Sequence, residues 1–224
     1  MSGVQTPSID FDAFIFDLDG TLLDTADDLG GALNRVLADA NVAPVAEHVY
    51  RPAASNGANA LLEVGFGDKW PELEQLALRQ QLLDYYAEDI AVHSKCFNGI
   101  EQLLIALDQN NIKWGIMTNK PGFLTEPLVQ AIPSLRDAKA VVSGDTLAVS
   151  KPSPDPLLHT AEILDVDPSR CLYIGDAERD IQAAKAANMY SATALWGYIP
   201  SVDAALGWQA DFNWQTPIDG LNHI

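Results

Sequence analysis

Short apolar segments alternate with helical segments from about residue 97 onward, and this alternation constrains the fold more than any other feature. The later segments carry apolar residues at helical or strand spacing, with turn residues between them. A chain with this rhythm forms a mostly parallel sheet covered by helices on both faces. We therefore predict a doubly wound, parallel α/β fold. The expected strands are residues 13–16, 114–117, 140–142, 171–174 and 192–195.

A purely helical segment separates the first expected strand from the others. Its apolar residues predict helices over about 26–40, 58–64 and 71–90, with no strand between them. The first helix follows Thr25, in a sequence that resembles a capping box. Three helices in succession make a helical insert of about seventy residues, a size typical of a small domain. We predict a core domain of residues 1–23 and 94–224 and an inserted helical cap domain of residues 24–93.

The composition excludes several classes of function. The formal net charge of the 224 residues is −18, with 31 acidic and 13 basic residues, which argues against nucleic-acid or anionic-membrane partners. Cys96 and Cys171 have neither metal-ligand nor redox spacing, which favours a reduced, cytoplasmic setting. No apolar run is long enough to span a membrane, and residues 1–10 lack the pattern of a signal peptide. We expect a cytoplasmic protein without a membrane partner.

Polar residues collect where the expected strands end. Because the carboxyl ends of parallel strands meet at one edge of a sheet, these residues are expected to form one site. Each of them alone is ordinary turn or capping chemistry, but their joint occurrence on this scaffold points to catalysis. They are Asp17 and Asp19 after the first strand, Thr118 and Asn119 after another, Lys151 before a helix, and Asp176 and Asp180 after a later strand.

The sequence Asp17-Leu18-Asp19-Gly20-Thr21 carries the strongest chemical signal. Two carboxylates two residues apart at a strand end repel each other unless a cation or a proton lies between them. This arrangement favours a division of labour, with one acid as nucleophile, the other as acid and base, and a divalent cation that offsets the charge.

Calcium binding explains these aspartates poorly. An EF-hand loop needs Gly at its sixth position and Glu at its twelfth. Counting from Asp17 gives Leu22 and Asp28, and counting from Asp176 gives Ile181 and Ala187. A non-catalytic phospho-acceptor or binding module remains as an alternative, although such a module has no need of a second acid beside the nucleophile.

The motifs resemble those of haloacid dehalogenase superfamily phosphatases over essentially the whole chain. The sequence at Asp17 matches the first motif, Thr118-Asn119 the second, Lys151-Pro152 the third, and Gly175-Asp176 with Asp180 the fourth. The resemblance implies a Rossmann-like core with an inserted helical cap. A departure from the family pattern is Ala177, where many relatives carry Ser or Asp.

The resemblance also implies a role for each motif residue. Asp17 is expected to form an aspartyl-phosphate, and Asp19 to act as the acid and base. Mg²⁺ is expected to bind the Asp17 carboxylate, the Asp19 backbone carbonyl and Asp176, with Asp180 orienting this shell from the second layer. The phosphoryl group is expected to contact Thr118, Asn119 and Lys151.

The position of the insert resembles the phosphoglycolate phosphatase branch of the superfamily, and several shorter strings are closer to its N-acetylmuramic acid 6-phosphate phosphatase relatives. The implied partner is a small phosphorylated metabolite such as 2-phosphoglycolate or N-acetylmuramic acid 6-phosphate. Arg51 and Asn56 are candidate substrate contacts from the insert. A sugar-phosphate mutase of the same superfamily shares the whole core and remains an alternative. The oligomeric state, monomer or homodimer, stays open.

Overall fold

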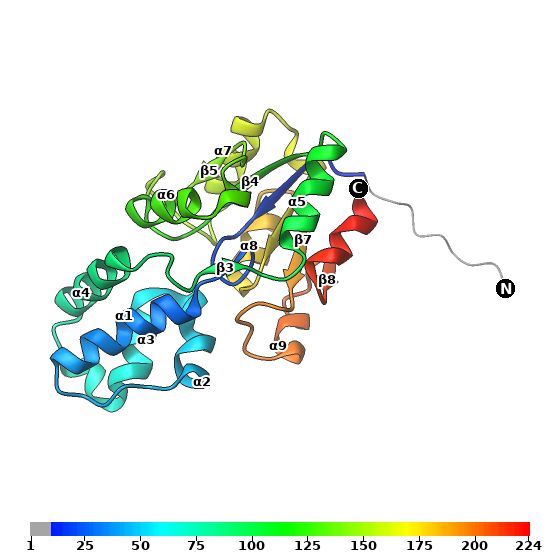
Figure 1. Ribbon diagram of the computed structural model, residues 1–224. Coiled ribbons are helices and arrows are strands. Elements are labelled where there is room, and N and C mark those ends of the chain that lie inside the picture. The colour runs from blue at the N-terminus through cyan, green and yellow to red at the C-terminus, as the bar shows by residue number, and fades with distance from the viewer. Residues whose placement is uncertain (1–9) are drawn as a thin grey trace.

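The computed structural model describes residues 10–224, so the predicted lack of a signal peptide at the N-terminus lies outside the described residues. Its centre is a six-stranded sheet in the order β5-β4-β1-β6-β7-β8, and all paired neighbours are parallel (Figure 1). The predicted parallel α/β fold is confirmed. The strands are β1 (Ala13–Phe16), β4 (Lys113–Met117), β5 (Val141–Val142), β6 (Cys171–Gly175), β7 (Tyr190–Ala194) and β8 (Phe212–Trp214).

Alternation of side chains along β1 gives the sheet two buried faces. Phe14 and Phe16 pack in one apolar cluster with residues of α5 (Ile100–Gln109) and α6 (Gly122–Ala131). Ala13 and Ile15 pack in a second cluster with residues of α7 (Asp155–Leu164) and α8 (Glu178–Ala186). Because both faces are covered, every residue of β1 is apolar and buried.

The helices of the insert pack around one apolar cluster, to which Leu124 and Tyr198 of the sheet domain also contribute. The insert contains α1 (Ala26–Asp39), α2 (Glu47–Tyr50), α3 (Gly57–Phe66) and α4 (Gln75–Glu88), with two 3₁₀ segments, Arg51–Asn56 and Gly67–Glu72. Figure 1 shows these helices gathered to one side of the sheet, beneath its carboxyl edge. Leu33, Leu37, Leu61 and Leu82 are fully buried among them. The insert therefore buries apolar residues of its own helices and also packs against the sheet domain.

Several elements differ from the sequence-based expectation. The short helices α2 and α9 (Val202–Leu206) and the strand β8 were not expected, and α4 begins at Gln75 rather than near residue 71. The expected capping role of the Thr25 side chain was wrong. Thr25 is the residue before α1, but its φ of −107° and ψ of 2° lie outside the extended region usual for a capping residue, and its side chain makes no capping hydrogen bond. Its Oγ1 donates to Asp19 Oδ1 at 2.6 Å.

Two neighbouring connections join the insert to the sheet. Leu23 and Asp24 form β2, which pairs antiparallel with β3, Lys95–Cys96. Nearby, the buried carboxylate of Asp28 accepts hydrogen bonds from the backbone N–H of His93 and from the N–H and Oγ of Ser94. Asp28 thus ties the start of the insert to its end.

The location and assembly of the protein stay predictions. Cys96 and Cys171 are both free cysteines. Among residues 10–224, no helix combines the length and the hydropathy that a membrane crossing needs.

Candidate active site

The sheet order brings three of the predicted motifs to one place. β1 lies between β4 and β6, and it pairs with both of them. Asp17 follows β1, Thr118 follows β4 and Asp176 follows β6, so all three lie at the same carboxyl edge. The chain leaves β1 toward β4 on one side of the sheet and later returns to β6 on the other. Such a change of direction is where doubly wound folds bind their ligands.

Three buried carboxylates converge at this edge around one lysine. Oxygen atoms of Asp17, Asp176 and Asp180 lie within 4.8 Å of one another. Nζ of Lys151 lies 3.0 Å from Oδ1 of Asp17 and 2.8 Å from Oδ1 of Asp180. The Lys151 side chain is 0% exposed, so its charge acts on these carboxylates with little screening by water. One lysine cation offsets only part of the negative charge that three carboxylates can carry.

The Asp176 carboxyl group is buried beside the two other carboxyl groups of this cluster. Burial and the charges of Asp17 and Asp180 raise its pKa from 3.8 to about 7, although Ser55 Oγ and the Tyr198 N–H both donate hydrogen bonds to it. Its Oδ1 is buried and accepts no hydrogen bond from any residue of the described chain. An unpaired carboxylate oxygen, facing two further carboxylates, fits a divalent cation with hard oxygen ligands. Asp17 and Asp176 are the direct candidates for its coordination.

Asp180 has a different set of contacts. Its Oδ2 accepts the Ala177 N–H at 2.9 Å, and its Oδ1 faces Lys151. These contacts fix the start of α8 and the position of the lysine. They suit an outer role for Asp180, as predicted for a residue that orients the metal shell.

Lys151 is held in place from behind by two residues. Its Nζ donates to the Tyr173 hydroxyl at 2.7 Å, and that hydroxyl donates to the Met117 carbonyl at 2.8 Å. The Asn119 side chain accepts the Lys151 N–H and donates to the Lys151 carbonyl, both at 3.0 Å. The Asn119 side chain therefore joins the second motif to the third. The predicted contact of Asn119 with the phosphoryl group would use its backbone N–H.

Gly20 allows the first motif to turn beneath Asp176. Its φ of +78° is in the left-handed region that favours glycine. A Cβ at this position would lie 2.1 Å from Oδ2 of Asp176 and 2.8 Å from Oγ of Ser55. The close approach of the first and fourth motifs thus requires glycine here.

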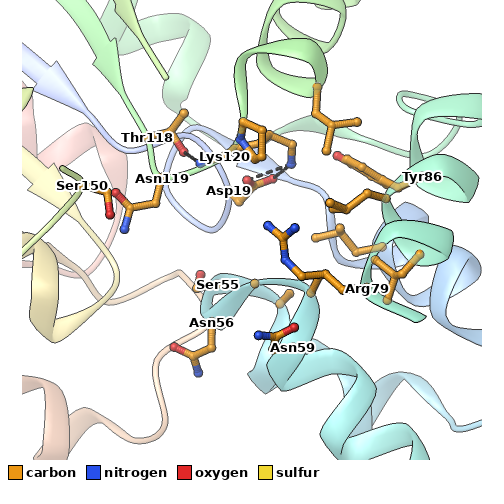
Figure 2. Close-up of a pocket in the computed structure, with 18 of the residues that line it drawn as sticks. Asp19, Ser55, Asn56, Asn59, Arg79, Tyr86, Thr118, Asn119, Lys120 and Ser150 are labelled. Carbon is orange, nitrogen blue, oxygen red and sulfur yellow. Dashed lines mark hydrogen bonds and ion pairs between the residues drawn. The ribbon is translucent and has the colours of Figure 1, made fainter. Parts of the chain in front are cut away.

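Asp19 is held apart from the other carboxylates by two donors. Nζ of Lys120 lies 2.8 Å from its Oδ1 and 2.9 Å from its Oδ2 (Figure 2). Thr25 Oγ1 also donates to Oδ1. The Asp19 side chain keeps 15% of its surface exposed, and the Lys120 side chain only 6%. Asp19 is thus fixed by its contacts yet open to the pocket.

The pocket between the sheet edge and the insert has a volume of about 430 Å³. Asp17, Asp19, Thr118 and Asn119 line it from the sheet side. Asn56, Asn59 and Arg79 line it from the insert (Figure 2). The volume lies within the usual range for pockets that bind small organic molecules, roughly 300–1,000 Å³.

The insert also touches the acidic cluster directly. Ser55 Oγ donates to Asp176 Oδ2 at 2.6 Å. Arg179, at the start of α8, donates to the Ser55 carbonyl and, at 3.3 Å, to Asn56 Oδ1. The segment that carries Ser55 and Asn56 is therefore bonded to two residues of the fourth motif region.

Arg51 lies outside the lining of this pocket. Its guanidinium is 2.6 Å from Asp24 Oδ2 and 3.4 Å from Glu47 Oε1, and it lies over the Tyr198 ring. The Tyr198 hydroxyl in turn donates to Asp24 and accepts the N–H groups of Thr25 and Ala26. These contacts hold the connection to α1, and a contact between Arg51 and substrate stays a prediction.

Sequence reasoning missed four residues that shape the site: Arg79, Lys120, Tyr173 and Arg179. Tyr173 lies inside an apolar strand and Arg79 inside the helix α4, where both residue types are common without function. Lys120 directly follows the second motif, and Arg179 lies between Asp176 and Asp180. Their proximity to the motifs was the available signal.

Comparison with known proteins agrees with this geometry. Among curated proteins, a phosphoglycolate phosphatase from Xylella fastidiosa is 42% identical over 200 residues, which cover 88% of this chain and 86% of the relative. An N-acetylmuramic acid 6-phosphate phosphatase from Pseudomonas aeruginosa is 39% identical over 199 residues, covering 89% of this chain and 88% of the relative.

Among solved structures, a predicted phosphoglycolate phosphatase from Haemophilus somnus superposes with a TM-score of 0.84. It is 26% identical, and the match covers 94% of this chain and 96% of that chain. The sequence profile described as haloacid dehalogenase-like hydrolase matches residues 14–194, which include all four motifs. With the sheet order, the acidic cluster and the buried lysine, these matches show that the chain belongs to the haloacid dehalogenase-like hydrolases.

Proposed function

We propose that this protein is a Mg²⁺-dependent phosphomonoester hydrolase that acts through an aspartyl-phosphate on Asp17. The observation that carries the proposal is the buried cluster of Asp17, Asp176 and Asp180 around Lys151, with Asp19 beside it at the pocket. Both curated relatives described above are named as phosphatases. A mutase or a phosphate-binding module is not favoured by these names.

In the first half of the reaction, a carboxylate oxygen of Asp17 attacks phosphorus and the bond from phosphorus to the leaving oxygen breaks. Asp19, protonated at this stage, gives its proton to that oxygen. Thr118, the Asn119 N–H and Lys151 contact the phosphoryl oxygens and offset their charge. Mg²⁺, when bound by Asp17 and Asp176, would reduce the repulsion between these carboxylates and the phosphoryl group.

In the second half, the Asp19 carboxylate takes a proton from water. The resulting hydroxide attacks phosphorus and the bond to Asp17 breaks, which releases inorganic phosphate and restores both acids. Lys120 and Thr25 hold Asp19 in the pocket through both halves. The Asp19 side chain lies outside the cluster of Asp17, Asp176 and Asp180, which leaves its carboxyl group free for both proton transfers. The Asp19 backbone carbonyl stays a proposed ligand of Mg²⁺.

We also propose that residues 24–93 act as a cap on a core of residues 1–23 and 94–224. The hydrogen bonds from Ser55 to Asp176 and from Arg179 to Asn56 support a closed arrangement that excludes water from the site. The substrates named for the relatives, 2-phosphoglycolate and N-acetylmuramic acid 6-phosphate, are the leading candidates for this chain. Asn56 is proposed to contact the leaving group.

A substrate screen tests the proposed function. Purified protein with Mg²⁺ is expected to hydrolyse p-nitrophenyl phosphate and, with higher kcat/KM, at least one phosphorylated metabolite in a panel that contains both candidates. Chelation of the metal is expected to abolish the activity. Absence of phosphate release from every compound would overturn the proposal, and persistence of a phospho-aspartate against water would instead favour a mutase.

Replacement of Asp19 by asparagine is expected to lower kcat by about 10²–10⁴-fold, because the variant cannot supply or accept the proton. The loss should be smaller for p-nitrophenyl phosphate, whose leaving group departs without protonation, than for an alkyl phosphate. Mg²⁺ binding, measured by calorimetry, should persist, because the Asp19 side chain is not part of the acidic cluster. Asp27→Asn, an exposed substitution on α1, serves as the control. Equal losses on both substrate types would argue against the acid role.

Metal affinity is expected to rise with pH up to about 7. The pKa of Asp176 is raised from 3.8 to about 7, so the metal-free protein keeps this proton between those values while the unfolded chain loses it. The free energy of unfolding of the metal-free protein is therefore highest, as far as Asp176 is concerned, below pH 3.8, where the group is protonated in both states. This contribution is lost as the pH rises through 7, because the folded protein must then give up a proton that the unfolded chain has already lost.

Because Mg²⁺ needs the ionised carboxylate, its affinity should fall about tenfold for each pH unit below 7. The measurement is the increase in Tm on adding Mg²⁺ at pH 5.5 and at pH 8. A larger increase at pH 8 is expected, and Asp176→Asn should remove the difference. An identical increase at both pH values would contradict the prediction.

A further inference from the structure

One arginine in the pocket has no role in the chemistry proposed above. Arg79 is half-buried on α4 and lines the pocket. Within residues 10–224 it forms no hydrogen bond or ion pair with another residue, whereas each of the other five arginines has a polar partner. Those five are Arg35, Arg51, Arg136, Arg170 and Arg179.

The direction of the side chain adds to this contrast. Figure 2 shows the Arg79 guanidinium pointing from α4 into the pocket, toward the side where Asp19 lies. Asn59, from α3, lines the same wall; it is exposed, and its side chain has no hydrogen-bond partner among the described residues. In a chain with a net charge of −18, a guanidinium has many possible surface partners. A guanidinium that lines a pocket without a partner in the described residues is available to a ligand.

In the proposed function, the phosphoryl group already has a lysine cation and hydrogen-bond donors to contact. Lys151, Thr118 and the Asn119 N–H lie at the sheet edge, together with the metal-binding carboxylates. Arg79 comes from the opposite wall, which belongs to the insert (Figure 2). A substrate with its phosphorus at Asp17 therefore presents its leaving group to Arg79.

We propose that Arg79 binds a carboxylate on the leaving group, so that the preferred substrates are phosphomonoesters that also carry a carboxylate. This inference rests on the proposed function and adds a specificity-determining residue to it. The planar guanidinium donates two parallel hydrogen bonds to a carboxylate, a geometry that lysine cannot match. The two substrates named for the relatives, a glycolate ester and a lactyl-substituted sugar, both contain a carboxylate.

Paired substrates that differ in the carboxylate test the inference. N-acetylmuramic acid 6-phosphate is compared with N-acetylglucosamine 6-phosphate, and 2-phosphoglycolate with ethyl phosphate. Arg79→Gln is expected to lower kcat/KM for the carboxylate-bearing member of the preferred pair by about 10–100-fold, mainly through KM. The loss on the carboxylate-free member should be much smaller. Arg79→Lys should restore part of the preference, because it keeps the charge but not the paired donors.

Arg35→Gln is the matched control. Arg35 lies on α1 of the same insert but pairs with Glu88 and Asp89 at the surface, so its replacement should leave the preference unchanged. Equal loss on both members of each pair in Arg79→Gln, or a wild-type protein without preference for the carboxylate, would overturn the inference.

A binding measurement separates this inference from the proposed function. The affinities of the four compounds are measured by calorimetry in Asp17→Asn with and without Arg79→Gln. A carboxylate preference that disappears with Arg79→Gln supports the inference even if the wild-type protein hydrolyses nothing. Hydrolysis of p-nitrophenyl phosphate without any carboxylate preference in binding or turnover overturns the inference and leaves the proposed function standing.

Discussion

Replacement of Asp17 by asparagine is expected to lower kcat by about 10⁴–10⁶-fold, the range typical for loss of a nucleophile or its closest partner. Oδ1 of Asp17 accepts the Leu18 N–H at 2.8 Å and faces Lys151. The described residues give Oδ2 no hydrogen bond, which leaves this oxygen for phosphorus. The side-chain amide oxygen of asparagine can keep the contacts with the Leu18 N–H and Lys151, so the fold should be unchanged. The amide is a poor nucleophile, so attack on phosphorus should be lost.

The stability of the metal-free protein provides an independent check. Asp17→Asn removes one of three carboxylates whose oxygens lie within 4.8 Å of one another. Relief of this repulsion should leave the metal-free Tm equal to or higher than that of the wild type, while the increase in Tm on adding Mg²⁺ becomes smaller. Asp17→Ala is the companion variant, because it cannot regain a carboxylate by deamidation. Appreciable turnover in both variants would remove Asp17 as the nucleophile.

Replacement of Lys151 by methionine is expected to have the largest effect on stability. The substitution leaves Asp17 and Asp180 buried without their shared cation. Loss of one partner of a buried ion pair typically costs about 3–5 kcal/mol. For a chain of this size, 1 kcal/mol corresponds to a Tm shift of about 2–4 °C, so the metal-free Tm should fall by about 6–20 °C. Turnover should also fall strongly, because the phosphoryl group loses a cation.

Calorimetric unfolding with and without Mg²⁺ tests the role of Lys151. Mg²⁺ should restore part of the lost stability, because it supplies positive charge to the same carboxylates. A second change, Asp180→Asn, should also recover part of it in the double variant. Lys113→Met is the control, since Lys113 donates only to backbone carbonyls near the surface. A Tm within about 2 °C of the wild-type value would show that Lys151 is not the cation that stabilises the cluster.

The part of the site that could be predicted from the sequence consists of the residues that directly follow the strands of the sheet. The residue that follows a buried strand in a parallel sheet has a fixed position at the edge, whatever the loops do. Asp17, Thr118 and Asp176 are brought together in this way. Their chemical roles, by contrast, came from the resemblance to a family and stay predictions.

The rest of the site depends on contacts that no local pattern specifies. Arg79 and Ser55 reach the pocket only because the insert folds over the sheet edge, which is a tertiary arrangement between distant segments. Thr25 is a similar case: it precedes α1, but its backbone does not have the usual capping conformation, and its hydroxyl donates to Asp19, a contact that the local sequence does not specify. The strand β8 was missed because its three residues, Phe212–Trp214, are too few to show alternation.

The paired connections β2 and β3 bear on how such proteins diversify. Leu23 lies opposite Cys96 and Asp24 opposite Lys95, so the chain leaves the sheet domain and re-enters it at neighbouring points. A module whose two ends are adjacent can be lengthened, shortened or exchanged without disturbing the strands that flank it. With the cap role proposed above, evolution can graft new leaving-group recognition onto an unchanged phosphoryl-transfer centre. The same junction offers protein engineers a place to exchange inserts between relatives.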